Sequence, residues 1–137
     1  MANAPLIVSC DIDWASLDLF GHVNNIAFFF YVQKARVTLC EGIGLTSLNE
    51  AGKLGFIVAS SQCNFLKPLF YPGIVSVHGH IKSIGRSSFT LNYKLFNQTH
   101  ELCATAEDVL VLYNYQQRLK VSIDESLNAR MIQYLQK

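Results

Sequence analysis

One long apolar segment, from Asn24 to Glu41, constrains the fold of this 137-residue chain more than any other feature. Its sparse polar interruptions are Gln33, Lys34, Arg36, Thr38 and Glu41. Asn24 or Asn25 can cap the start of a helix and Gly42 can end it, so the pattern predicts a helix roughly 27 Å long. Because the segment is apolar nearly all round, we expect the helix to be buried. It falls short of the roughly 18–20 apolar residues that span a bilayer.

The rest of the chain mostly follows the two-residue period of half-buried strands. Strands are predicted over Leu6–Trp14, Phe56–Leu66, Val75–Ile81, Phe89–Leu95 and Leu102–Tyr113. We further expect a loop over 15–23, turns at 71–73, 85–86 and 97–100, a helical turn around 47–51 and a C-terminal helix over 124–136. Short connections between successive strands produce antiparallel pairing. The sequence therefore predicts a single α+β domain over residues 1–137, with about five antiparallel strands and a long helix on one face.

The composition of the chain bears on its partners and its compartment. Half of the residues are hydrophobic and 15% are charged, which is apolar for a small soluble monomer and favours a homo-oligomer. A net charge of +1 predicts no binding to nucleic acid or to an anionic membrane. No signal peptide is evident at the start, so we expect a cytoplasmic protein. The cysteines, Cys10, Cys40, Cys63 and Cys103, lie in apolar elements without a paired spacing and are expected to be reduced, with no bound metal.

Chemistry is most readily placed in the loop before the long helix. Asp18 precedes the run from Gly21 to Asn25, which leads into that helix. Free N–H groups at a helix start favour negative charge, so they can stabilise the oxyanion formed when a thioester carbonyl is attacked. A nearby carboxylate can attack the carbonyl or activate water. The same residue types also serve as caps and turn residues, so local chemistry alone leaves both interpretations open.

A family resemblance favours catalysis. The stretch from Trp14 to Asn25 resembles the signature of the 4-hydroxybenzoyl-CoA thioesterase family, in which an aspartate precedes Gly-His-Val-Asn-Asn and an aromatic run on the helix precedes Ala-Arg. Further matching pieces are Phe28–Tyr31, Ala35-Arg36, Phe65–Pro68, Tyr71–Gly73, Gly85–Phe89 and Val109–Leu112. The resemblance implies a hotdog fold, in which the sheet wraps around a long central helix. It also implies a homodimer or homotetramer with active sites at subunit interfaces.

The resemblance assigns roles within the loop. Asp18 takes the position of the catalytic carboxylate, and Asn25 that of the residue whose backbone N–H polarises the thioester carbonyl. His22 either assists proton transfer to the leaving thiolate or orders the loop, and Asn24 either contacts the substrate carbonyl or caps the helix. The chain departs from the family at Ser16, where many relatives carry an acidic residue, and at Asp124, where an Ile-Pro pair often stands.

Other candidates lie outside the loop. By the resemblance, Ser60 and Ser61 would line the site from a partner subunit, or else bond within the sheet or face solvent. Arg86 would contact CoA phosphates, or else be an ordinary exposed turn arginine. His78 and His80 share one strand face, but no third metal ligand stands at a suitable spacing.

The expected activity is hydrolysis of an acyl-CoA thioester to a free acid and CoA, without a cofactor. Two alternatives remain: a thioesterase acting on acyl groups held by a carrier protein, and a non-catalytic acyl-CoA or lipid-binding module. Dehydration of hydroxyacyl thioesters is disfavoured, because that chemistry would call for His-Phe-Pro where this chain has His22-Val23-Asn24. The sequence specifies neither the acyl group nor whether Asp18 acts as nucleophile or general base.

Overall fold

A computed structural model describes residues 4–45 and 54–136 of the chain. The elements in chain order are β1 (Leu6–Asp11), a 3-10 helix (Trp14–Ser16), α1 (Asn25–Gly42), β2 (Leu54–Phe65), β3 (Ile74–Ile84), β4 (Ser88–Phe96), β5 (Leu102–Asn114), β6 (Leu119–Lys120) and α3 (Glu125–Ile132). The helical turn expected at 47–51 lies outside the described residues.

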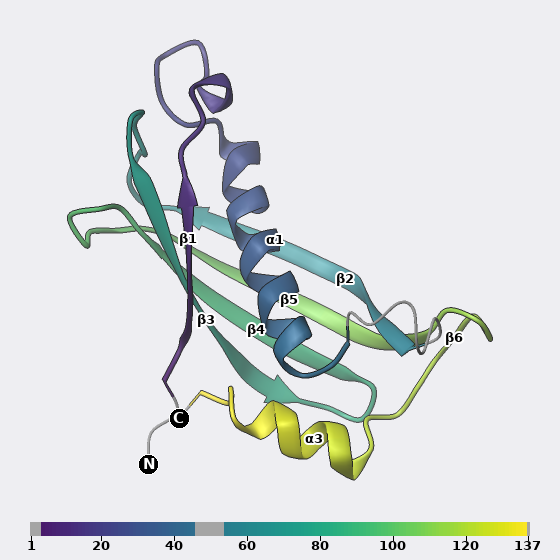
Figure 1. The fold of residues 1–137 in the computed structure, drawn as a ribbon. Coiled ribbons are helices and arrows are strands. Elements are labelled where there is room, and N and C mark those ends of the chain that lie inside the picture. The colour runs from purple at the N-terminus through teal and green to yellow at the C-terminus, as the bar shows by residue number, and fades with distance from the viewer. Residues whose placement is uncertain (1–3, 46–53, 137) are drawn as a thin grey trace.

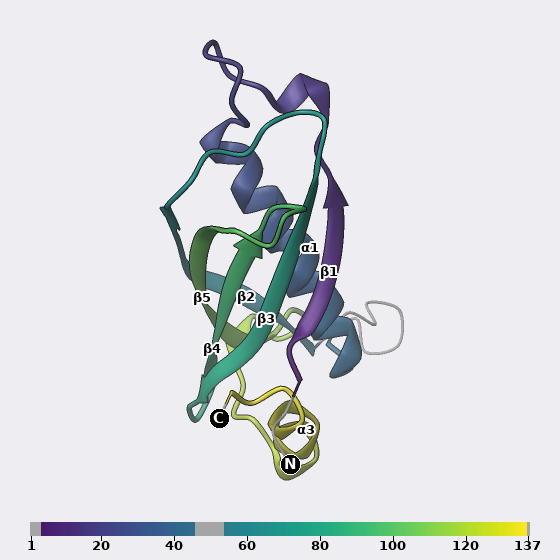
Figure 2. The same ribbon diagram turned by 90° about the vertical axis from the view of Figure 1, so that its left-hand side faces the viewer.

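The strands form one antiparallel sheet in the order β1-β3-β4-β5-β2, with the short strand β6 added beside β5. This curved sheet wraps α1 on one side (Figures 1 and 2). β6 was not predicted, since two residues are too few to show a period. β1 pairs with β3 only as far as Gly79. Past that point, the C-terminal segment lies beside β3 and forms a parallel bridge between Ile81 and Leu135. The predicted α+β layer is confirmed.

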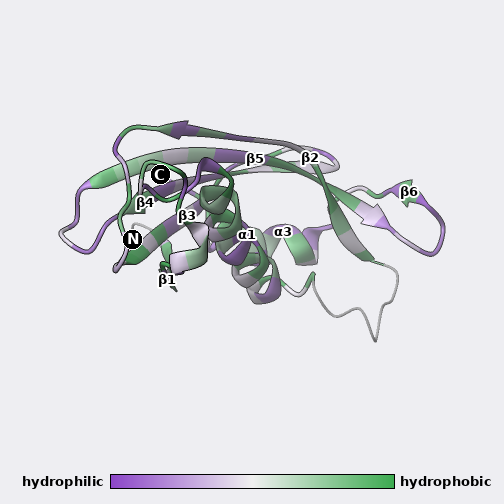
Figure 3. Cartoon of the chain, turned by 90° about the horizontal axis from the view of Figure 1, so that it is seen from above, coloured by the Kyte–Doolittle hydropathy of each residue, from purple (hydrophilic) through white to green (hydrophobic). Residues whose placement is uncertain are grey.

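The long helix is buried on only one of its faces. Seven of its residues face the sheet and are buried: Ala27, Phe28, Tyr31, Val32, Ala35, Leu39 and Cys40. The expected burial holds for this face only, because Ile26 and Phe30 on the other side keep 59% and 64% of their surface exposed in the single chain. Viewed from above, the helices lie on one side of the sheet and no described helix covers the other (Figure 3).

Several helix and strand ends differ from the predicted ones, because capping contacts fix where these elements begin and end. β1 stops at Asp11, and the Asp13 side chain then accepts a hydrogen bond from the Ala15 N–H and caps the 3-10 helix. The long helix includes Gly42, and the left-handed residue that follows it is Gly44, with φ +84°. Asp124 is the N-cap of α3, so aspartate performs the capping that makes a proline unnecessary there.

One polar cluster lies inside the core. Asp108 on β5 is fully buried and accepts hydrogen bonds from Arg36 (3.0 Å), Tyr93 (2.7 Å) and Ser61 (2.6 Å). Arg36 comes from α1, so the ion pair ties the helix to the sheet. The four cysteines are free in this structure.

Candidate active site

The loop before α1 closes around the carboxylate of Asp18. Its Oδ1 accepts hydrogen bonds from the backbone N–H groups of Phe20 (2.9 Å) and His22 (3.0 Å). The backbone N–H of Asp18 donates to the His22 carbonyl at 2.7 Å. Gly21 supplies the tight reversal with φ +81°, a conformation that favours glycine. The other carboxylate oxygen, Oδ2, accepts no hydrogen bond from the described part of the chain and is available for chemistry.

The helix start is fixed by its cap. The Asn24 side chain accepts a hydrogen bond from the Ile26 N–H at 2.8 Å, and its own N–H donates to the Ser16 carbonyl at 2.7 Å. Of the two roles left open for Asn24, its side chain therefore performs helix capping. The N–H of Asn25, the first helical residue, donates to no acceptor within residues 4–45 and 54–136. It is one of the unpaired donors that a helix N-terminus presents to a ligand.

Asp18 and Asn25 both line one open cavity of about 310 Å³. Its lining residues are Asp18, His22, Val23, Asn25, Phe28, Phe65, Leu66, Lys67 and Pro68. Phe28 and Phe65 meet edge to face, with ring centroids 5.1 Å apart, and form an aromatic wall. A carboxylate and a backbone donor beside an apolar wall suit an ester with a hydrophobic acyl group.

His22 lines the cavity but is tied to the loop in two ways. Its backbone closes the loop on Asp18, and its ring packs edge to face on Phe70 with centroids 5.2 Å apart. Its ring nitrogens form no hydrogen bond with residues 4–45 or 54–136, so the backbone and ring contacts favour the loop-ordering interpretation.

The sequence did not indicate Lys67 as a site residue. Its ammonium group contacts Glu101 at 2.7 Å, and it lines the cavity that contains Asp18. The hydrogen bond from Lys67 holds the pKa of the Glu101 carboxyl at about 2, and the pKa of Lys67 is raised in turn. Lys67 stands inside the matching piece Phe65–Pro68, but no local pattern there indicates that it reaches the site.

Four predicted residues do not line this cavity within the single chain: Asn24, Ser60, Ser61 and Arg86. Ser60 and Ser61 lie on β2, where the Ser61 hydroxyl donates to buried Asp108. Arg86 is exposed in the turn between β3 and β4. Ser61 also borders a second cavity of about 230 Å³ between α1 and β2, whose other lining residues are Ile26, Phe29, Phe30, Gln33, Arg36 and Val58.

Neither a cluster of metal ligands nor a membrane-spanning helix occurs in the described residues. No three His, Cys, Asp or Glu side chains gather there as metal ligands. None of the helices among them is long and apolar enough to cross a membrane.

Comparison with known proteins identifies relatives over most of the chain. A family model described as the thioesterase-like superfamily matches residues 12–131. The protein YsmA of Bacillus subtilis is 29% identical over 100 residues, which cover 73% of this chain and 67% of YsmA. A Thermus thermophilus thioesterase, solved in complex with coenzyme A and zinc, is 28% identical with a TM-score of 0.82, covering 96% of this chain and 94% of that one. The PA5185 protein of Pseudomonas aeruginosa shares the fold, with a TM-score of 0.86 at 23% identity over 98% and 94% of the two chains.

Proposed function

The chain belongs to the thioesterase-like superfamily and has its hotdog fold, and from this premise we propose that it hydrolyses acyl-CoA thioesters to a carboxylic acid and CoA. The observation that carries the proposal is one cavity that holds both a carboxylate with a free oxygen and an unpaired helix-start N–H. The structure of the Thermus thermophilus relative with coenzyme A supports CoA as the thiol carrier.

Asp18 and Asn25 divide the chemistry between them. The free Oδ2 of Asp18 attacks the thioester carbonyl carbon or takes a proton from a water that attacks it. The carbonyl oxygen becomes an oxyanion, which the Asn25 N–H and the positive end of the α1 dipole stabilise. Collapse of this tetrahedral intermediate breaks the carbon–sulfur bond, and the CoA thiolate leaves and takes up a proton. In the nucleophilic route, water then hydrolyses the Asp18–acyl anhydride.

The loop geometry gives the carboxylate a defined orientation. Two backbone N–H groups hold Oδ1, so the second oxygen projects from a fixed position. A carboxylate held in this way needs little reorganisation as the reaction proceeds, which is the general advantage of a preorganised site.

The proposed active enzyme is a homodimer paired along β2. β2 is an edge strand, and the adjoining face of α1 exposes Ile26 and Phe30 beside Val58. An exposed apolar face next to an unpaired strand edge is typical of a surface covered in an assembly. In such a dimer, Ser60, Ser61 and Arg86 would serve the partner's cavity, with Arg86 contacting CoA phosphates.

Asp18→Asn tests the catalytic assignment. The amide keeps an oxygen that can accept both loop hydrogen bonds, but it removes the charge and the basicity. We expect kcat to fall roughly 10²–10⁴-fold against a panel of short, long and aromatic acyl-CoA esters, measured by thiol release. Asp13→Asn is the matched control, because Asp13 caps the nearby 3-10 helix and does not line the cavity. An undiminished rate for Asp18→Asn would refute the assignment, and binding of acyl-CoA without cleavage by the natural chain would favour a binding module.

A single turnover in ¹⁸O-labelled water tests for the nucleophilic route. With enzyme in excess, attack of water on the Asp18 carbonyl of the anhydride leaves label in the carboxylate, which general-base catalysis never does. Label found only in the released acid fits general-base catalysis or attack of water on the acyl carbonyl of the anhydride. Mass spectrometry of the peptide that contains Asp18 gives the answer.

Val58→Arg tests the assembly. A charge on the β2 edge should yield a monomer in analytical ultracentrifugation and reduce activity, whereas Ile7→Arg, on the opposite edge strand, should not. Ile7 is 55% exposed against 37% for Val58, so it is at least as accessible a position. A Val58→Arg protein that stays dimeric and active would overturn pairing through β2.

A further inference from the structure

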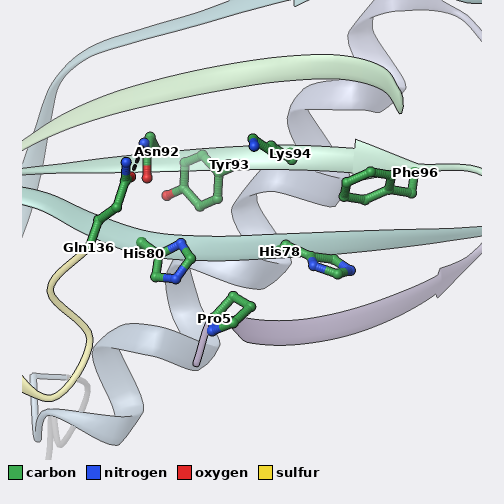
Figure 4. Close-up of a pocket in the computed structure, with 8 residues that line it drawn as sticks. All are labelled: Pro5, His78, His80, Asn92, Tyr93, Lys94, Phe96 and Gln136. Carbon is green, nitrogen blue, oxygen red and sulfur yellow. Dashed lines mark hydrogen bonds between the residues drawn. The ribbon is translucent and has the colours of Figure 1, made fainter. Parts of the chain in front are cut away.

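The sheet face opposite α1 contains a recess that the proposed reaction does not use. The recess has a volume of about 370 Å³ (Figure 4). Its lining residues are Pro5, His78, His80, Asn92, Tyr93, Lys94, Phe96 and Gln136. Along β3, Val77 and Ile81 are buried in the core, while His78 and His80 alternate with them and point to the outer face. The sheet therefore separates this recess from α1.

Strand register holds the polar side chains of the recess together. His78 lies opposite Lys94, and His80 lies opposite Asn92, on the neighbouring strands β3 and β4. Directly opposed residues have Cβ atoms about 4.5–5.5 Å apart, so these four side chains form one compact group.

The C-terminal segment forms one wall of this recess. The backbone N–H of Gln136 donates to the Ile81 carbonyl at 2.7 Å, and its side chain accepts a hydrogen bond from the Asn92 amide (Figure 4). Two independent contacts thus fix this wall against the strands.

The charged groups that line the recess are all basic. Burial lowers the pKa of the His78 imidazole, and the positive charges of His100, His80 and Lys94 lower it further. Glu107 on β5 is the acidic residue opposite Asn92, but its carboxylate is paired with the Lys82 ammonium at 2.7 Å. Among residues 4–45 and 54–136, the basic groups that line the recess are therefore Lys94 and the two histidines, and no carboxylate lines it.

We propose that this recess binds a small organic anion, through a carboxylate or phosphate group placed between Lys94 and the two histidines. The Lys94 ammonium and a protonated imidazole supply charge-assisted hydrogen bonds to such a group. Phe96, whose ring centroid lies 4.7 Å from that of His78, and Pro5 provide an apolar wall for the body of the ligand. A metal ion is disfavoured, because the two histidines have only the side-chain amides of Asn92 and Gln136 as further ligands in the recess, and the Lys94 ammonium would repel a cation.

Histidine NMR tests the site directly on the untagged natural chain. We would titrate protein carrying ¹³C-labelled histidine with inorganic phosphate, phenyl phosphate or benzoate between pH 5.5 and 8. The signals of His78 and His80 should shift saturably with at least one of these anions. The pKa of His78 should rise on binding, because an anion stabilises the imidazolium. Comparison of phenyl phosphate with benzoate decides which charged group is preferred.

Two variants localise the effect. Lys94→Gln should weaken binding about tenfold, since it removes one charge-assisted contact. Lys120→Gln removes the same charge from β6, outside the recess, and should leave the affinity unchanged within a factor of two.

Three results would overturn the proposal. One is a His78 pKa that does not move with any of the anions. Another is equal weakening by Lys94→Gln and Lys120→Gln, which would indicate a nonspecific charge effect. The third is a change of oligomeric state in Lys94→Gln without loss of anion binding, which would make this face a contact between copies of the chain. None of these measurements depends on hydrolysis, so the anion site is tested independently of the proposed function.

Discussion

Asp18 and Asp108 place the same carboxylate in opposite surroundings. Asp18 lies in an exposed loop, where backbone N–H groups occupy one oxygen and the other stays open to a cavity. Asp108 is fully buried, and side chains from three elements occupy both of its oxygens. The first arrangement leaves one oxygen open to a ligand, and the second commits both oxygens to contacts inside the core, of which the one with Arg36 holds α1 on the sheet.

The difference shows how a chain can separate catalysis from stability. A buried carboxylate requires compensation for lost hydration, so Arg36, Tyr93 and Ser61 must be present together. A carboxylate at a loop retains its water and needs only to be oriented. Substitution of Asp18 should therefore disturb activity without unfolding the chain, and substitution of Asp108 should destabilise the fold.

The sharpest test makes the same change at both positions. Asp108→Asn removes the partner charge of Arg36, whose side chain is 13% exposed, and should lower the free energy of unfolding by about 3–5 kcal/mol. Asp18→Asn should change it by less than about 0.5 kcal/mol, because the amide oxygen still accepts the loop hydrogen bonds. Urea denaturation of both variants gives the comparison, and equal losses would show that the two sites are not separate.

A smaller loss is expected when a single donor is removed from the buried cluster. Tyr93→Phe deletes the phenol that donates to Asp108 at 2.7 Å and should cost about 1.5–3 kcal/mol of unfolding free energy. Burial raises the pKa of Tyr93, followed by the effect of the Asp108 charge, so the phenol keeps its proton and remains a donor. Tyr113→Phe, on β5 outside this cluster, is the control, measured in the same urea series.

The smallest effect lies at the rim of the candidate active site and depends on pH. Glu101 has a folded-state pKa of about 2 against an ordinary value of 4.5, so the unfolded chain binds its proton first as the pH falls. The stabilisation by its contact with Lys67 is complete above pH 4.5 and is lost between pH 4.5 and 2. Glu101→Gln should flatten the stability profile over that window, while Glu41→Gln, at an exposed position of α1, should leave the profile unchanged. A profile unaltered by Glu101→Gln would contradict the assignment.

Much of the fold was predictable because its signals are local. The two-residue periods of β3, β4 and β5 and the apolar run of α1 each appear within a short window of sequence. The helix end was misplaced because Gly42 and Gly44 stand close together, and composition does not reveal which of them is left-handed.

The site was predictable only in part. Asp18 and Asn25 form part of a recognisable string, and the structure brings both to one cavity. Lys67 reaches the same cavity from the end of β2, which is a tertiary contact with no local signal. Asp108 alternates in register with Ala106 and Leu110, so its inward position was visible in principle, but its partners Arg36 and Tyr93 come from distant parts of the sequence.

The composition of β2 affects how readily an unpaired chain aggregates. Its twelve residues, from Leu54 to Phe65, include no charged side chain and no proline, the usual means by which an edge strand resists indiscriminate pairing. A newly made chain with this edge uncovered is prone to aggregate, and a partner strand would act as its shield. For the dimer proposed above, soluble yield should therefore fall when assembly is delayed, so the β2 edge would matter for protein quality control as well as for the proposed activity.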